Sequence, residues 1–533
     1  MANCPSCYNN LHSAEVPGLQ RRFCELVTPA MQKFDLLVIG GGINGAGIAA
    51  DAAGRGLSVA LCEKADLGSG TSSASTKLIH GGLRYLETWE FGLVRKALNE
   101  SETLLHLAPH VIHPMCFHLP YEKHHRPWLL IRLGLFLYNT LAHRPSYKKA
   151  RAVRFGPDSP LDGALTHGFV YYDGWVDDAR LVVLNALQAA RKSARIMTRT
   201  ECLALEAVDQ GWQASLLDHV SEKQFTIQAK TVINAAGPWV SRLARQLTGQ
   251  APQLDVRLVK GSHIVVPLMQ PLDQAYLLQN EDQRVIFAIP YEQRFTLIGT
   301  TEEDFNKDPA EAVISDNEID YLVNAVNRYF KRSISRKDVV HAYSGVRPLV
   351  SDKQSLARKV TRDYRLEFEN TPEPLLSVYG GKITTYRLLA KQAVDKMGKH
   401  LSGIKRSRTR KAILPGGDFK MREQLYQVLA SSNNWIRPDI IKRWIHAYGN
   451  LSFEIVRNVS SMSDMGMNFG HGLFQREVDY LVENEWARTA DDVLWRRTKL
   501  GLLFTPEQSA ELDHYLRDKV IKQDIKTRTW VSR

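Results

Sequence analysis

The chain has few cysteines and no long apolar run. Six cysteines scattered over 533 residues do not form a disulfide framework, which is typical of a reducing compartment. Cys4 and Cys7 stand close together, but no second Cys/His pair follows at zinc-finger spacing, so we expect no metal site. No stretch of about 20 apolar residues occurs, which argues against a membrane-spanning helix. Residues 1–33 also lack the pattern of a secretory signal, and we expect them to form a flexible extension.

Length and charge narrow the class of protein further. A chain of 533 residues usually divides into two or three domains, and 44% hydrophobic residues argue against disorder. Lys and Arg number 69 against 57 Asp and Glu, so the net charge is +12. This balance favours anionic partners such as phosphorylated substrates, acidic lipid or nucleic acid, and by itself does not choose among them.

A glycine turn follows the first strand-like segment. Residues 36–39 form a continuous apolar run that predicts a buried parallel strand, and an Ala-rich helix is expected over 46–53. Between them, Gly40 permits a sharp turn, Gly42 lets a pyrophosphate approach the backbone, and Gly45 lets helix and strand pack closely. The free N–H groups at the start of the helix then predict a phosphate site.

Three later segments extend this site. A second strand over 57–62 ends at Glu63, whose carboxylate can accept both ribose hydroxyls and would repel the 2′-phosphate of NADP. The hydroxyl-rich tract 71–77 continues into the glycine-rich residues 80–85 and could run under a flavin, although alone it could also be a capped helix start. Residues 231–239 predict a strand ending in small residues beside the same nucleotide. Two separate segments that converge on one cofactor favour FAD over NAD.

From about Phe34 to the C-terminus, the sequence resembles the FAD-dependent, respiratory (aerobic) glycerol-3-phosphate dehydrogenases of bacteria and their mitochondrial relatives. This family belongs to the D-amino-acid-oxidase-like flavoproteins. The N-terminal extension lies outside the resemblance. The blocks that carry it are Asp35–Gly47, Thr71–Glu87, Tyr172–Arg180, Lys260–Pro267, Ile298–Thr301, Tyr343–Leu349 and Gly380–Arg387.

The resemblance implies an α/β fold in which two domains are interleaved. A discontinuous, Rossmann-like FAD-binding domain is expected over 34–400. An antiparallel-sheet substrate domain is inserted into it, roughly at 100–165 and 265–345. Helix-forming residues then predict an all-α C-terminal domain over 414–533, for which packing against the core or dimerisation is a sufficient role.

The resemblance also implies the reaction, which is oxidation of sn-glycerol 3-phosphate to dihydroxyacetone phosphate. Hydride passes to FAD, and electrons then pass to membrane quinone. Arg84, Arg347 and Lys382, with Arg362 as a further candidate, are expected to converge on the phosphate, and Tyr85 and Thr300 to orient the substrate. Lys382 could instead neutralise charge at the flavin pyrimidine.

The proton acceptor has two candidates. His263 can take the alcohol proton, because an unperturbed imidazole titrates near neutral pH. Alternatively, Arg347 stabilises the alkoxide without a discrete base. The residues expected to bind FAD are Gly40, Gly42, Asn44, Gly45, Glu63, Thr71, Ser72, Ser73, Lys77, His80, Gly81, Gly237, Pro238, Trp239, Gly381, Lys382 and Thr384.

A short apolar segment could contact lipid. Residues 128–138 are apolar, aromatic at both ends and flanked by Lys and Arg, which suits a helix lying at a membrane surface and equally a buried helix between domains. Because the family passes electrons to quinone, we expect a cytoplasmic enzyme peripherally attached to the inner membrane, and a homodimer is possible. No RNA-binding signature stands out, so no nucleic-acid partner is expected.

Three other functions compete with this interpretation. An oxygen-using glycerol-3-phosphate oxidase shares both flavin and substrate. An amine or amino-acid oxidase is more distant, because several cationic residues in the matching blocks suit a phosphate. A basic binding protein that holds FAD only structurally would leave the flavin oxidised when substrate is added.

Overall fold

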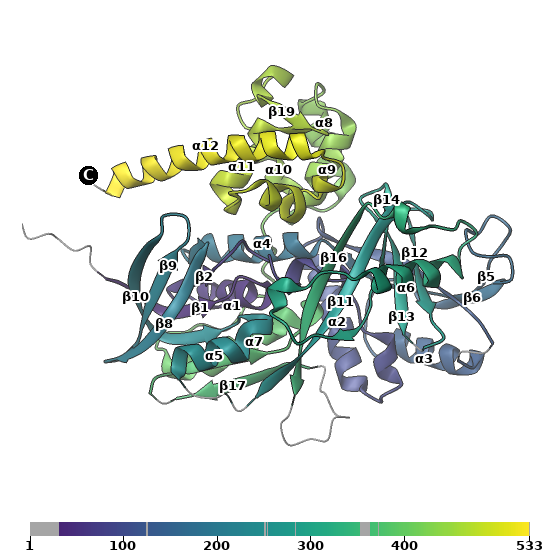
Figure 1. Ribbon diagram of the computed structural model, residues 1–533, viewed down its shortest axis with the longest axis horizontal. Helices are drawn as coiled ribbons and strands as arrows, with labels where there is room; N and C mark the ends of the chain where they lie inside the picture. The colour runs from purple at the N-terminus through teal and green to yellow at the C-terminus, as the bar shows by residue number, and fades with distance from the viewer. Residues whose placement is uncertain are drawn as a thin grey trace, which may run out of the picture.

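The computed structural model describes residues 31–531, apart from residues 124–125, 250–251, 253, 283, 352–362 and 371. Residues 1–30, and with them nearly all of the expected N-terminal extension, lie outside this part of the chain. The described residues form two large sheets, which lie side by side, and a mainly helical C-terminal layer across one side of them that holds a small two-stranded sheet (Figure 1).

The first sheet is built around parallel strands in the order β18-β10-β1-β2-β7. Antiparallel strands extend it, with β17 beside β18 and the hairpin β8-β9 beside β10. The strands are β1 (Gln32–Ile39), β2 (Val59–Glu63), β7 (Arg195–Thr198), β8 (Thr200–Val208), β9 (Gly211–Asp218), β10 (Lys223–Asn234), β17 (Arg365–Glu369) and β18 (Leu375–Tyr379).

Both faces of this sheet are covered, which explains the continuous apolar run in β1. Leu36 and Val38 share one core with helices α1 (Ile43–Gly54), α4 (Asp178–Ala190) and α7 (Tyr386–Met397). Leu37 and Ile39, on the opposite face, share another core with β8, β9 and α5 (Val240–Thr248). Successive side chains of a strand point to opposite faces, so a strand between two cores needs apolar residues at every position.

The second sheet is mostly antiparallel and runs β15-β11-β14-β13-β12-β4-β6-β3, with β16 beside β11 and β5 beside β6. Helices α2 (Phe91–Leu107) and α3 (Trp128–Thr140) share the core of one face, and α6 (Asp316–Asn327) shares the core of the other. Strands β3, β6 and most of β11 lie outside the ranges expected for the inserted domain. The strands are β3 (Leu78–Ile79), β4 (Ile112–Pro120), β5 (Arg151–Arg154), β6 (His167–Val176), β11 (Asp255–Pro267), β12 (Gln274–Gln279), β13 (Val285–Tyr291), β14 (Phe295–Gly299), β15 (Glu303–Asp304) and β16 (His341–Ser351).

The C-terminal layer, which comprises residues 422–531, has its own core and is mainly helical. It also contains a two-stranded ribbon of β19 (Asn468–Gly470) and β20 (Leu473–Phe474), so the expectation of an all-α domain is wrong in this detail. The ribbon closes because Gly470 and Gly472 adopt φ of +123° and +75°, a region that glycine enters without steric cost. The helices are α8 (Arg422–Ser432), α9 (Pro438–Tyr448), α10 (Ser452–Ile455), α11 (Gln475–Glu485), the π-helix η10 (Asp492–Arg497) and α12 (Pro506–Val531).

Candidate active site

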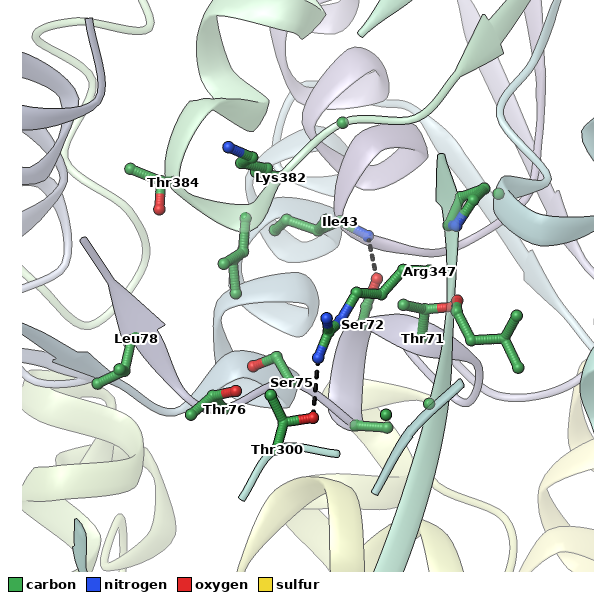
Figure 2. Close-up of a pocket in the computed structure, with 18 of the residues that line it drawn as sticks. Ile43, Thr71, Ser72, Ser75, Thr76, Leu78, Thr300, Arg347, Lys382 and Thr384 are labelled. Atoms are coloured by element: carbon green, nitrogen blue, oxygen red, sulfur yellow. Dashed lines mark hydrogen bonds between the residues drawn. The ribbon is translucent and has the colours of Figure 1, made fainter. Parts of the chain in front are cut away.

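The glycine turn between β1 and α1 leaves the start of α1 open toward a large cavity. Gly40 has φ of +108°, and a Cβ on Gly45 would lie 1.8 Å from the carbonyl oxygen of Gly40. Gly42 precedes the helix without a side-chain cap, while the Ile43 N–H donates to Ser72 Oγ at 3.0 Å (Figure 2). Unpaired N–H groups and the positive end of a helix dipole form a ready anion site, which suits a pyrophosphate.

Glu63 lies at the end of β2, beside this turn. Its Oε2 accepts from the Gly41 N–H at 2.7 Å and its Oε1 from the Ala65 N–H at 2.8 Å. Burial raises the pKa of this carboxyl, and the two backbone donors oppose that rise. The carboxylate is therefore held in one orientation at the cavity wall, where a ribose could meet it.

Segments far apart in the sequence meet around the start of α1. Thr71, on the short helix η1 (Thr71–Ser73), donates through Oγ1 to the Val346 carbonyl of β16 at 2.6 Å. The Asn44 side chain donates to the Gly380 carbonyl at 3.2 Å, and the His80 N–H donates to Thr384 Oγ1 at 3.3 Å. These bonds join η1 to β16, and the start of α1 and the residue after β3 to the segment after β18.

Two cations converge on the same cavity. The Nη2 of Arg347 donates to Thr300 Oγ1 at 2.8 Å (Figure 2). Gly261 makes this possible, because a Cβ there would lie 2.5 Å from that hydroxyl. The ammonium of Lys382 lies 4.0 Å from the ring centre of Tyr85. Burial, followed by the charges of Lys382 and Arg347, lowers the pKa of His80 to about 4, so both cations act on one place.

His263 projects from β11 and is almost completely buried. Its Nε2 lies 3.0 Å from Thr76 Oγ1, and its ring stacks on Tyr343 at 4.9 Å. Gly299 leaves room for the ring, since a Cβ there would lie 2.2 Å from an imidazole carbon. Burial and the charges of Arg347 and Lys77 hold the pKa of His263 well below its ordinary value. Both effects favour the neutral imidazole, so His263 is a weaker proton acceptor than an unperturbed histidine, and its catalytic role stays a prediction.

One cavity of about 1310 Å³ collects most of the residues expected at the site. Gly45 and Gly81 are not on its wall, because Gly45 packs on Gly40 and Gly81 packs on Leu98 and Tyr138. Those on the wall are Gly40, Gly42, Asn44, Glu63, Thr71, Ser72, Ser73, Lys77, His80, Tyr85, Gly237, Pro238, Trp239, His263, Thr300, Arg347, Gly381, Lys382 and Thr384.

Three of the expected residues need separate mention. Lys77 reaches the cavity wall, but its ammonium forms a buried ion pair with Asp178 at 2.7 Å. Arg84 belongs to the short helix η2 (Leu83–Leu86), and its side chain is not described. Arg362 lies outside the described residues.

The cavity wall also includes residues for which the sequence predicted no role at the site. Trp495, Arg496 and Lys499 come from the C-terminal layer, and His341 of β16 stacks on Trp495 at 4.1 Å. From the sequence, packing against the core or dimerisation was a sufficient role for this layer. In the part of the chain that the structure describes, no group of three or more His, Cys, Asp or Glu is placed to hold a metal.

Comparison with known proteins decides the family. The model of the FAD dependent oxidoreductases matches residues 35–387, and that of the C-terminal domain of alpha-glycerophosphate oxidase matches residues 407–516. Glycerol-3-phosphate dehydrogenase of Pseudomonas aeruginosa is 46% identical, covering 92% of this chain and 96% of the relative. The chain belongs to the family of FAD-dependent glycerol-3-phosphate dehydrogenases. The aerobic enzyme of Escherichia coli is 45% identical, covering 91% and 98% of the two chains.

Members and relatives of this family do not all carry the same substrate name. D-erythritol 1-phosphate dehydrogenase of Brucella abortus is also 45% identical, covering 89% of this chain and 96% of the relative. Among solved structures, glycerol-3-phosphate dehydrogenase of Bacillus halodurans, complexed with FAD, has a TM-score of 0.72 at 28% identity, covering 93% and 91% of the two chains. The interleaved α/β fold and the FAD-dependent oxidoreductase class are thereby confirmed.

The residues present fit FAD. The open start of α1 suits its pyrophosphate, and the oriented carboxylate of Glu63 suits its ribose. Gly40 could not carry a side chain, since a Cβ there would lie 2.6 Å from the Ala235 carbonyl oxygen.

Proposed function

We propose that this protein oxidises sn-glycerol 3-phosphate to dihydroxyacetone phosphate and passes the electrons to a membrane quinone. One observation carries the proposal. The dinucleotide cradle at the start of α1 and the cations Arg347 and Lys382 line the same cavity. A phosphorylated alcohol needs a cationic site next to a hydride acceptor, and FAD supplies that acceptor when it is bound.

Each side chain has a defined task in this scheme. Lys382 attracts the phosphate dianion, together with Arg84 and Arg362, for which the family resemblance is the only support. Thr300 orients the alcohol through its hydroxyl, which Arg347 already holds at 2.8 Å. The low pKa of His263 makes it a weak base, which favours alkoxide stabilisation by Arg347 over proton uptake by the imidazole.

The decisive experiment is anaerobic addition of sn-glycerol 3-phosphate to the flavin-loaded protein. We expect the flavin absorbance to bleach and to return when a ubiquinone analogue is added. An oxidised spectrum that persists with substrate would refute the proposal and favour a protein that holds FAD only structurally. Rapid return with oxygen, and slow return with quinone, would instead identify an oxidase.

The substrate can be tested in the same cuvette. D-erythritol 1-phosphate is one carbon longer and carries the same phosphate, so it distinguishes chain length from phosphate recognition. We expect faster flavin reduction by sn-glycerol 3-phosphate at equal concentration, and faster reduction by the longer compound would reverse the assignment. An amino acid should leave the flavin oxidised.

Helix α3 supports action at a lipid surface. Its own residues Ile131, Leu135 and Tyr138 are buried, while Leu129, Leu130, Leu133 and Phe136 are between 52% and 74% exposed. Exposed apolar side chains on one face are typical of helices that lie in a membrane interface. Arg144 does not serve that surface, because it is buried and paired with Asp173 at 3.1 Å. No helix among the described residues is both long and apolar enough to span a bilayer.

The same helix supports the quinone as acceptor. Leu130, Leu133 and Leu137 of α3 lie on the wall of the cavity that also holds Arg347 and Lys382. An apolar ring compound dissolved in lipid could therefore approach the site from the exposed face of α3. We accordingly propose a cytoplasmic enzyme attached peripherally to the inner membrane. Homodimer formation stays a prediction, to be tested by analytical ultracentrifugation in detergent.

A further inference from the structure

Asp66 is a buried carboxylate in the loop between β2 and η1, and three arginines surround it. Its Oδ2 accepts from Arg496 Nε and from Arg497 Nη1, both at 2.5 Å, and its Oδ1 accepts from Arg497 Nη2 at 2.9 Å. Arg199, which precedes β8, is the third at 3.4 Å. Arg496 and Arg497 belong to η10, so the C-terminal layer binds a loop of the first sheet through these hydrogen bonds.

That loop is bonded to both halves of the dinucleotide cradle. The Gly68 N–H donates to the Gly41 carbonyl at 3.0 Å, within the glycine turn. The Ala65 N–H donates to Glu63 Oε1 at 2.8 Å. Residues one and two positions from Asp66 therefore orient the expected ribose carboxylate and contact the expected pyrophosphate turn.

A second carboxylate, Asp492 of η10, binds the same group of arginines. Burial alone would raise the pKa of Asp492, but the charges of Arg199, Arg497 and Arg496 hold it far below its usual range. Asp492 Oδ2 accepts from Arg199 Nη2 at 2.5 Å, and its Oδ1 also accepts from Arg496. Asp492 itself belongs to η10, so its ion pair with Arg199 is a second link between η10 and the first sheet, beside the bonds of Arg496 and Arg497 to Asp66.

We propose that Asp66 and Arg497, assisted by Arg496, are positioning residues through which the C-terminal layer sets the affinity for FAD. Asp66 and Arg497 are not on the cavity wall and act through the loop 64–70. If the loop is ordered before the cofactor binds, binding does not have to supply the conformational entropy that ordering the loop costs. The inference rests on the proposed binding of FAD in this cavity.

The test compares arginines that reach from the C-terminal layer into the rest of the protein. Arg497→Lys keeps the charge but loses the fork that grips Asp66. Arg422→Lys is the matched control, because Arg422 donates to the carbonyls of Pro109, at 3.0 Å from Nε, and His110, at 2.9 Å, away from the loop. The Kd for FAD is measured by serial dilution of the flavin-loaded proteins, and free flavin is followed by its fluorescence.

We expect Arg497→Lys to raise the Kd about tenfold or more, and Arg422→Lys to leave it within about twofold, at similar thermal stability. An unchanged Kd in Arg497→Lys would overturn the inference. Equal weakening by Arg422→Lys would do the same, because it would reduce the effect to general docking of the layer. If Arg497→Lys does not fold, Asp66→Asn, which keeps the side-chain size, is judged by the same criterion.

This outcome is separable from the proposed function. A wild-type protein that is bleached by sn-glycerol 3-phosphate, combined with an unchanged Kd in the variant, would overturn only the positioning role. A wild-type protein that binds no FAD would overturn both.

Discussion

Arg347 lies on the cavity wall, where it makes a hydrogen bond and also alters the pKa of its neighbours. It bonds Thr300, and its charge lowers the pKa of both His80 and His263. A planar guanidinium can hold two oxygens at once, whereas an ammonium is a point charge. The side chain can therefore serve either the phosphate or the developing alkoxide, and kinetics can separate these roles.

The first prediction concerns Arg347→Lys. Hydrogen bonds to charged groups contribute about 1.5–3 kcal/mol, so kcat/KM for sn-glycerol 3-phosphate should fall about tenfold to a hundredfold. A fall in kcat at nearly constant KM would assign Arg347 to the alkoxide, and a rise in KM alone would assign it to the phosphate. Arg257→Lys, on the same sheet but exposed and paired with Asp304, should change neither constant. An Arg347→Lys enzyme with wild-type kinetics would remove this residue from the site.

The second prediction concerns His263. Burial and the charges of Arg347 and Lys77 lower the pKa of His263, so we expect its imidazole not to titrate where an ordinary histidine does. The pH profiles of kcat/KM for the wild type and for His263→Gln should then have the same shape and differ only in height. If the wild type loses activity below about pH 6.5 through a group that is absent from His263→Gln, the imidazole is the base after all.

At the scale of elements, α3 is the helix whose sequence left two interpretations open. Its apolar residues suit a buried helix and a helix at a membrane surface equally, and in the structure three of them are buried in a core while four are exposed. The C-terminal layer lies away from it, across the molecule (Figure 1). Lipid contact through α3 would therefore leave that layer clear of the membrane.

The third prediction tests this face of α3. Leu129→Glu and Phe136→Glu, at two exposed residues of α3 that are not on the cavity wall, should reduce cosedimentation with vesicles containing anionic lipid, because each places a charge where an apolar side chain would enter the interface. Flavin reduction by substrate should persist, while turnover with a long-chain quinone in vesicles should fall. Val428→Glu is the control, since Val428 is 54% exposed on α8, in the C-terminal layer. Equal binding of all three variants would show that α3 does not meet lipid.

At the scale of the whole molecule, partly buried histidines line the contact between the C-terminal layer and the second sheet. His113 of β4 lies 5.7 Å from His446 of α9, ring centre to ring centre, and both pack against Trp175. Burial lowers the pKa of His446 to about 4, with the charge of Arg422 acting in the same direction. Burial and the charge of His446 hold the pKa of His113 well below its ordinary value.

The fourth prediction follows from the sign of these shifts. Between the lowered pKa values of the folded state and about 6.5 in the unfolded chain, the unfolded state binds more protons. The contribution of these two histidines to the free energy of unfolding is therefore fully present above about pH 6.5 and is lost as the pH falls toward about 4. The Tm should drop between about pH 7.5 and about pH 5, and it should drop less in His446→Gln. His106→Gln, an exposed control, should behave like the wild type. A Tm that is constant over this range would contradict the prediction.

The sequence by itself determined the parts that depend on neighbours along the chain. The apolar run of β1, the turn at Gly40 to Gly45 and the carboxylate of Glu63 follow from local sterics and hydrogen bonding, and their spacing specifies a nucleotide cradle. Local sequence could not decide what meets that cradle from a distance. Folding buries His263. It also brings Arg347 to Thr300 and Arg497 to Asp66, which are far apart in the sequence. Burial and Coulomb interactions depend on distance in space, so only the tertiary structure could lower the pKa of His263. For the same reason, only the tertiary structure could place residues of the C-terminal layer at the site.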